Sequence, residues 1–152
     1  MQLIDILKED YDGTLAFIDK CDQHMFAIKN WALVTTSAVI AFAISKGQHT
    51  IVLVNLILIP AFAYLELIYK SFQDTAVEHT TDISERIDKY LTGNASELLS
   101  GYKHGFGRRL LYPSLSQVRK VWVNKYRRHI RNFYGVIALF SVGAFYVGRY
   151  LF

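Results

Sequence analysis

Three long runs without a charged residue constrain the fold of this chain more than any other feature. They cover residues 30–45, 47–65 and 132–148 of a chain of 152 residues. Each run is apolar around the whole circumference of a helix, whereas a surface helix of a soluble protein carries a single apolar stripe. A chain of this length cannot bury three such helices in one core. We therefore expect an all-α integral membrane protein rather than a soluble helical bundle.

The short connection between the first two runs predicts an antiparallel pair of transmembrane helices. Residues 46–50 leave room only for a tight turn. The first run gives a helix of about 24 Å, short of the roughly 30 Å hydrocarbon core of a bilayer. Lysine side chains flank this run on both sides, and they extend to the interface and cover the difference.

The distribution of Lys and Arg predicts the orientation. Residues 70–131 carry 12 of them, counting both ends, whereas the connection between the first two runs carries only Lys46. The positive-inside rule places residues 70–131 and the N-terminus in the cytoplasm.

Four parts follow from these patterns. Apolar residues at spacings of three and four, such as Ile4, Leu7 and Tyr11, make the beginning of the chain an amphipathic helix. The third run has 17 residues, so the alternative to a transmembrane helix is a segment that lies partly in the membrane interface. The expected parts are an N-terminal amphipathic cytoplasmic helix (1–29), a two-helix transmembrane hairpin (30–69), a long cytoplasmic helical extension with a basic region (70–131) and a third, C-terminal transmembrane helix (132–152).

Charge is divided unevenly along the chain. Residues 1–97 hold all 13 acidic residues and 7 Lys/Arg, whereas residues 98–152 hold 10 Lys/Arg and no acid. Anionic headgroups attract such a basic segment by about 1 kcal/mol per side chain, which makes membrane lipids its first expected partner. RNA or an acidic protein partner is the alternative, and the acidic face of the N-terminal helix is a candidate within the protein. The expected basic partner or lipid surface comprises Lys103, Arg108, Arg109, Arg119, Lys120, Lys125, Arg127, Arg128 and Arg131.

Small and polar residues recur inside the apolar runs. Membrane helices associate through close packing of small residues and through interhelical hydrogen bonds. Asn55 needs a polar partner in the membrane, and Pro60 should kink its helix. These residues either pack the helices of one protomer or build a homo-oligomer, and we favour the oligomer. The expected packing or pore residues are Ser37, Ala41, Ser45, Asn55, Pro60, Glu66, Gly135, Ala138 and Ser141.

Glu66 directly follows the second uncharged run and interrupts its apolar stretch, which continues through Leu67, Ile68 and Tyr69. An acid at membrane depth indicates a role in a pore or in proton handling. The alternative is an interfacial carboxylate paired with Lys70, four residues further along the helix.

Catalysis has little support in the sequence. The five histidines are scattered, and the single cysteine, Cys21, excludes a zinc cluster built from cysteines. His79 and Asp82 share a helical face, which we interpret as an exposed polar face. No histidine follows an arginine by the four to six residues of the ribonuclease signature found in some defence proteins. We expect no enzyme, no catalytic residue, no metal and no cofactor.

One set of motifs resembles a known group of proteins. Phe26, Lys29 and Trp31 precede a first helix rich in small residues, and Asn55, Pro60 and an acid with Tyr-Lys (residues 66–70) follow the short connection. Over about residues 20–90 the chain resembles small bacterial two-transmembrane-hairpin proteins of antiphage defence, namely SLATT-type effectors and small CRISPR-associated membrane accessory proteins. The resemblance implies an inner-membrane effector that oligomerises and perturbs the membrane when a partner senses infection.

These considerations give a leading function and two rivals. The leading hypothesis is an oligomeric effector that forms or gates a pore in the bacterial inner membrane. The first rival is a non-conducting membrane anchor or accessory subunit that recruits a soluble protein or RNA through its basic region. The second, a transporter or membrane enzyme, depends on Glu66 alone, and no inverted repeat supports it.

Overall fold

The computed structural model describes residues 3–92, 115–123 and 128–151, and every regular element in them is helical. The elements are α1 (Leu3–Ser45), the 3-10 helix η1 (His49–Val54), α2 (Asn55–Leu91), α3 (Leu115–Val123) and α4 (Arg128–Leu151). The prediction of an all-α protein is thus confirmed for the described residues.

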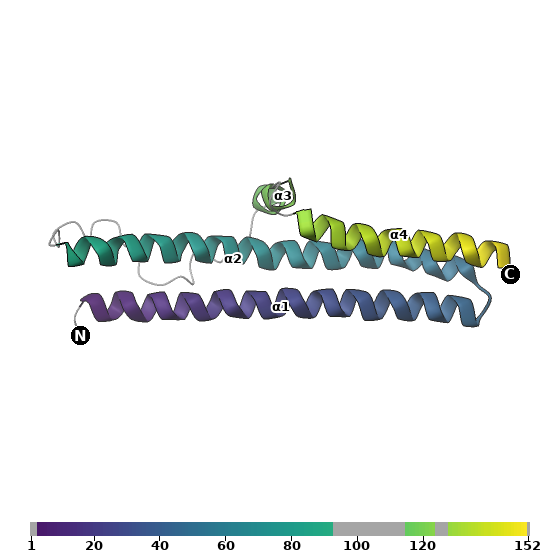
Figure 1. Ribbon diagram of the computed structural model, residues 1–152, viewed down its shortest axis with the longest axis horizontal. Helices are drawn as coiled ribbons and strands as arrows, with labels where there is room; N and C mark the ends of the chain where they lie inside the picture. Colours follow the sequence, from purple (N-terminus) through teal and green to yellow (C-terminus); the bar gives the residue numbers. More distant parts are fainter. Residues whose placement is uncertain (1–2, 93–114, 124–127, 152) are drawn as a thin grey trace.

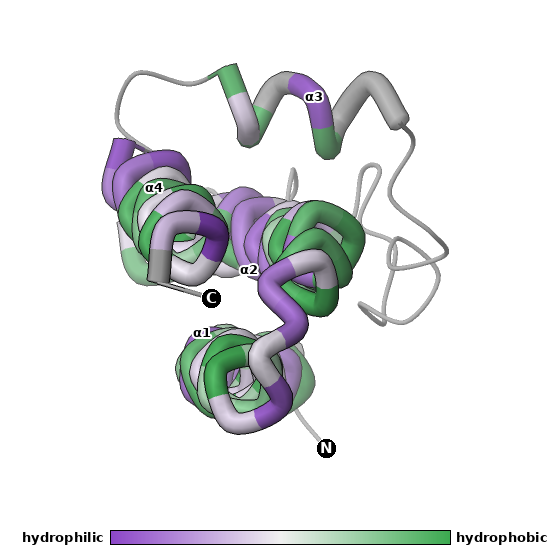
Figure 2. Tube along the Cα trace, turned by 90° about the vertical axis from the view of Figure 1, so that its right-hand side faces the viewer, coloured by the Kyte–Doolittle hydropathy of each residue, from purple (hydrophilic) through white to green (hydrophobic). Residues whose placement is uncertain are grey.

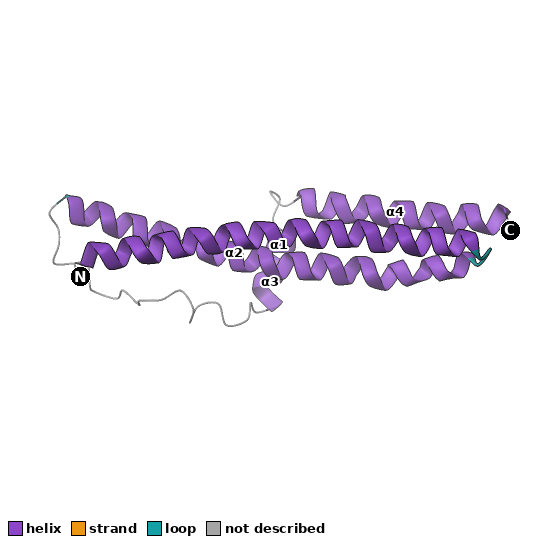
Figure 3. Cartoon of the chain, turned by 90° about the horizontal axis from the view of Figure 1, so that it is seen from below, coloured by secondary structure: helices purple, strands orange, loops and turns teal. Residues whose placement is uncertain are grey.

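Two long antiparallel helices form the body of the molecule. Helices α1 and α2 lie side by side, and α4 lies along only the half that contains their connection (Figure 1). Among the described residues, the other half contains only α1 and α2, as Figure 3 shows from a second direction. Helix α3 is seen end-on in Figure 1 and lengthwise in Figure 2, so it crosses the direction of the other helices.

Three helices are long and apolar enough to cross a membrane, within Ile4–Ser45, His49–Leu91 and Arg128–Tyr150. Large apolar side chains are exposed mainly in the half that contains α4, among them Trp31, Phe42, Ile57, Leu139 and Phe140. We call residues 30–66 and 130–150 the apolar half, and residues 3–28 with 70–91 the arm. An apolar surface of this extent is unfavourable in water, so the chain is that of a membrane protein.

The arm is a pair of helices packed through regularly spaced residues. Leu7, Thr14 and Cys21 of α1 are buried at intervals of seven, and Leu7 packs in a cluster with Ile83 of α2. This spacing is that of a coiled-coil seam. Helix α1 is one unbroken helix, so the N-terminal amphipathic helix expected over residues 1–29 and the first membrane helix are continuous.

The turn after α1 is closed by a glycine. Gly47 has φ 62°, a left-handed conformation that glycine adopts without steric cost. The N–H of Gln48 donates to the Ala43 carbonyl at 2.9 Å and that of Gly47 to the Ile44 carbonyl at 3.1 Å, which makes a Schellman motif.

Helix η1 leads directly into α2, and α2 continues through Pro60, whose side chain is exposed.

The basic segment contains two separate helices. Apolar residues from Val118 to Phe133 recur at the spacing of a single helix, yet α3 and α4 run in different directions (Figure 2). Val118 and Val121 of α3 turn inward and join a cluster with Ile130 and Tyr134 of α4. These two residues hold α3 against the bundle.

Cys21 gives a direct test of the arm. The thiol is 2% exposed, and burial, with a contribution from the Asp22 carboxylate, raises its pKa. We expect maleimide to modify Cys21 at least about tenfold more slowly than an exposed thiol, because the thiolate is the reactive form. Mass spectrometry over time measures the rate. A chain with Cys21→Ser and Ala16→Cys, at an exposed position of α1, provides the comparison. Equal rates in both chains would contradict the packing of the arm.

Candidate functional site

A buried ion pair lies at the junction of the apolar half and the arm. Lys29 Nζ of α1 is 3.0 Å from Glu66 Oε1 of α2, and the Glu66 side chain is 1% exposed while that of Lys29 is 29% exposed. The Lys29 ammonium also lies 5.9 Å from the ring centroid of Phe133 on α4, within cation–π range. The buried Tyr134 side chain from α4 lies close to the same carboxylate. All three long helices thus contribute to one charged site.

Apolar packing keeps water away from this carboxylate. Ala32 and Ala63 are small, which lets membrane helices approach closely. The buried cluster around the ion pair comprises Ala32, Ile59, Ala63, Leu67, Val118, Val121, Ile130, Tyr134 and Ile137. A buried carboxylate of this kind is tolerated only when a cation compensates its charge, and Lys29 supplies that cation.

Glu66 pairs with Lys29 rather than with Lys70, the partner in the second of the two alternatives for this residue. The side chain of Lys70 instead donates a hydrogen bond to Gln73 and lies 3.9 Å from Asp74. Lys70 is one turn further toward the arm, where it meets the polar side chains of its own helix. Lys29 and Tyr134 are therefore site residues that the sequence analysis missed.

A second polar contact joins α2 and α4 deeper in the apolar half. Asn55 Nδ2 donates to Ser141 Oγ at 3.1 Å, and Ser141 Oγ donates to the Ile137 carbonyl at 3.1 Å. Both side chains are buried. The structure thus supplies Asn55 with the polar partner that a residue in hydrocarbon requires.

We expect Asn55→Ala and Ser141→Ala to show a coupling energy of roughly 0.6 kcal/mol, the mean for hydrogen bonds between membrane helices. Each single substitution removes the same hydrogen bond, so the double variant should lose less stability than the two single losses added together. Unfolding of the four chains in detergent measures the cycle. Strictly additive losses would show that the two side chains do not interact.

Three of the small residues of α1 point away from the other helices of the protomer. Ser37, Ala41 and Ser45 are all exposed, so for them intramolecular packing is the wrong explanation. On α4, Gly135 is exposed with no atom within 4 Å of an added Cβ, whereas Ala138 packs against the buried cluster. We call Ser37, Ala41 and Ser45 the small-residue face.

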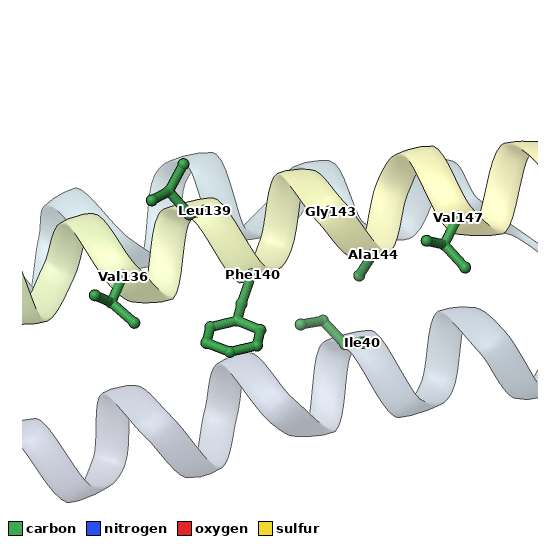
Figure 4. Close-up of a pocket in the computed structure, with 7 residues that line it drawn as sticks. All are labelled: Ile40, Val136, Leu139, Phe140, Gly143, Ala144 and Val147. Atoms are coloured by element: carbon green, nitrogen blue, oxygen red, sulfur yellow. The ribbon is translucent and has the colours of Figure 1, made fainter.

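An apolar groove runs between α1 and α4 in the same half of the molecule (Figure 4). Its volume is about 510 Å³. Ile40 borders it on α1, and Val136, Leu139, Phe140, Gly143, Ala144 and Val147 border it on α4. Ile40 lies between Ser37 and Ala41 in the sequence, so the groove and the small-residue face belong to the same turns of α1.

Part of the expected basic surface is described. Arg119 and Arg128 are exposed, and Arg131 Nη1 donates to the Trp122 carbonyl at 2.9 Å, which joins α4 to α3. The remaining members lie outside the described residues, or in the case of Lys120 have a side chain outside them: Lys103, Arg108, Arg109, Lys120, Lys125 and Arg127.

A third buried polar contact lies in the arm. His79 is 2% exposed and its Nε2 is 3.1 Å from Asp10 Oδ2 of α1, so the interpretation of His79 as part of an exposed polar face is wrong. Asp82 instead accepts a hydrogen bond from Arg86 at 3.2 Å. Among the described residues, no three His, Cys, Asp or Glu side chains come together as a metal site.

Comparison with protein-family models, with curated protein sequences and with solved structures finds no match to this chain.

Proposed function

We propose that this chain is an oligomeric effector of the bacterial inner membrane, in which helices from several copies form or gate a pore that perturbs the membrane. The observation that carries the proposal is the small-residue face, which lies exposed on α1 within the apolar half. Membrane helices use such faces to bring their backbones together. Three helices are too few to surround a water-filled path, so a pore requires several copies.

The arm fits a role in receiving a signal. Helices α1 and α2 each continue from the arm into the apolar half, so a displacement of the arm acts directly on the membrane helices. The Lys29–Glu66 pair lies where the two halves join and holds α1 against α2. The positive-inside rule supports a cytoplasmic position for the N-terminus and for residues 70–131. A role in antiviral defence depends on the resemblance to SLATT-type and CRISPR-associated membrane proteins alone.

Native mass spectrometry of the full chain released from detergent, followed by dye leakage from liposomes, tests the proposal. A closed ring of four or more copies that also releases dye would support it. A monomer or dimer would overturn it, because so few helices cannot enclose water.

One observation favours the alternative of a non-conducting membrane anchor. Arg119 and Arg128 present exposed cationic groups at the junction with the arm, where a soluble protein or RNA would meet them. Neutralising Arg127, Arg128 and Arg131 distinguishes the two functions. An anchor should then release its partner from isolated membranes, whereas a pore should still release dye from liposomes.

A further inference from the structure

Helix α3 has a different direction from the three long helices α1, α2 and α4. It lies across the bundle beside the first residues of α4 (Figures 1 and 2). Val118 and Val121 belong to the same buried cluster as Leu67 and Tyr134, so α3 sits at the level of the Lys29–Glu66 pair. This level is the junction where the exposed apolar surface of the bundle begins.

This position has a consequence in a membrane. If α1, α2 and α4 cross the bilayer, a helix that crosses them at the junction lies parallel to the membrane plane, at its cytoplasmic surface. Trp122 is 39% exposed and Val123 is 64% exposed on α3. Tryptophan is enriched at the headgroup level, where its apolar ring and its N–H group are both satisfied.

The same two helices carry positive charge. Arg119 of α3 and Arg128 of α4 are exposed, and the hydrogen bond from Arg131 to the Trp122 carbonyl fixes the two helices at their corner. Residues 98–152 contain no acid that would compensate this charge. Guanidinium groups bind phosphate through paired hydrogen bonds, so the corner is complementary to a phosphate that carries a negative charge.

We propose that the α3–α4 corner, formed by Arg119, Trp122, Arg128 and Arg131, is a binding surface for the headgroups of anionic phospholipids. The inference depends on the membrane position in the proposed function but not on a pore. A lipid is favoured over RNA because Trp122 and Val123 expose apolar surface beside the arginines, at the level where the apolar half begins. In a lipid complex these side chains leave water, whereas a nucleic acid backbone would leave them solvated.

The two tryptophans of the chain make the proposal testable. In a Trp31→Phe chain, Trp122 is the sole tryptophan. The chain is reconstituted in vesicles of phosphatidylcholine and phosphatidylglycerol, with bromine near the headgroup on one lipid or the other at equal mole fraction. We expect brominated phosphatidylglycerol to quench Trp122 roughly twofold more strongly, because the arginines enrich the anionic lipid around it.

Charge-neutralised variants separate a specific surface from general attraction. Arg119→Gln, Arg128→Gln and Arg131→Gln together should make quenching by the two lipids equal. Arg149→Gln, at the exposed opposite end of α4, should leave the preference unchanged. Equal quenching by both lipids in the parent Trp31→Phe chain would overturn the proposal.

A Trp122→Phe chain distinguishes failure of this inference from failure of the membrane position. It retains Trp31, which is exposed at the start of the apolar half. Quenching of Trp31 without any quenching of Trp122 would overturn the lipid surface alone, and a response of Trp122 to a single-stranded RNA oligonucleotide would then identify a nucleic acid surface. Absence of quenching at both positions would overturn the membrane position itself.

Discussion

Leucine at both Ser37 and Ala41 is expected to leave the chain monomeric and to abolish dye release from liposomes. Both residues are exposed on α1 in the apolar half, so the larger side chains change the surface without disturbing the fold of the protomer. Between copies, however, leucine prevents the close approach that small residues permit. Overpacking costs about 1–3 kcal/mol, which lowers an association constant by roughly 5-fold to 150-fold. Native mass spectrometry and liposome leakage measure the two effects.

The control for this variant is a small residue on another helix. Ala61→Leu introduces the same side chain at an exposed position of α2, also in the apolar half. Its subunit number and its leakage should equal those of the parent chain. If the parent is a ring and the Ser37→Leu/Ala41→Leu chain keeps both the ring and the leakage, the small-residue face is not the contact between copies.

The helical architecture is largely readable from the sequence, because its determinants are local. The uncharged runs predict three apolar helices, and the apolar spacing that includes Leu7 and Tyr11 predicts a seam, which the structure packs against Ile83 and Ile87. Gly47 ends α1 through a conformation that its own residue type permits. Each of these features depends on residues close together in the chain.

The sequence also contains enough information to predict which residues of the two hairpin helices lie at the same level. Lys29 lies 17 residues before Lys46, and Glu66 lies 16 residues after Thr50. Counting outward from the tight turn therefore brings the two charges to the same level on adjacent helices. The alternative of a pair with Lys70 depends only on spacing along one helix, whereas the buried Glu66 carboxylate requires a cation, which Lys29 supplies from the adjacent helix.

Other features depend on packing that no local pattern encodes. The direction of α3 follows from the burial of Val118 and Val121 against α2 and α4, which periodicity alone does not distinguish from a continuing helix. His79 is buried because Asp10 of α1 lies opposite it, 69 positions earlier in the chain. Tyr134 approaches Glu66 only because α4 returns to the junction. These contacts require the relative placement of three helices.

Substitution of Lys29 is expected to destabilise the chain more than substitution of Glu66. Lys29→Met leaves a carboxylate that is 1% exposed without its cation, and removal of one partner from a buried pair costs about 3 kcal/mol or more. Glu66→Gln leaves a lysine whose side chain is 29% exposed and still reaches water, so its cost is smaller. For a chain of this size the larger loss lowers the unfolding temperature by roughly 6–12 °C. Circular dichroism during heating in detergent measures both variants.

Lys20→Met is the matched control, because Lys20 is an exposed lysine on the same helix, and such substitutions usually change stability by less than about 0.5 kcal/mol.

The double variant Lys29→Met/Glu66→Gln then separates two roles of the pair. Removal of both charges leaves no buried ion, so stability should recover most of what Lys29→Met loses. Recovered stability together with altered dye release would identify the pair as part of the opening mechanism rather than a packing element. Equal losses in the two single variants would instead mean that water reaches Glu66, and the carboxylate at the junction would not depend on Lys29.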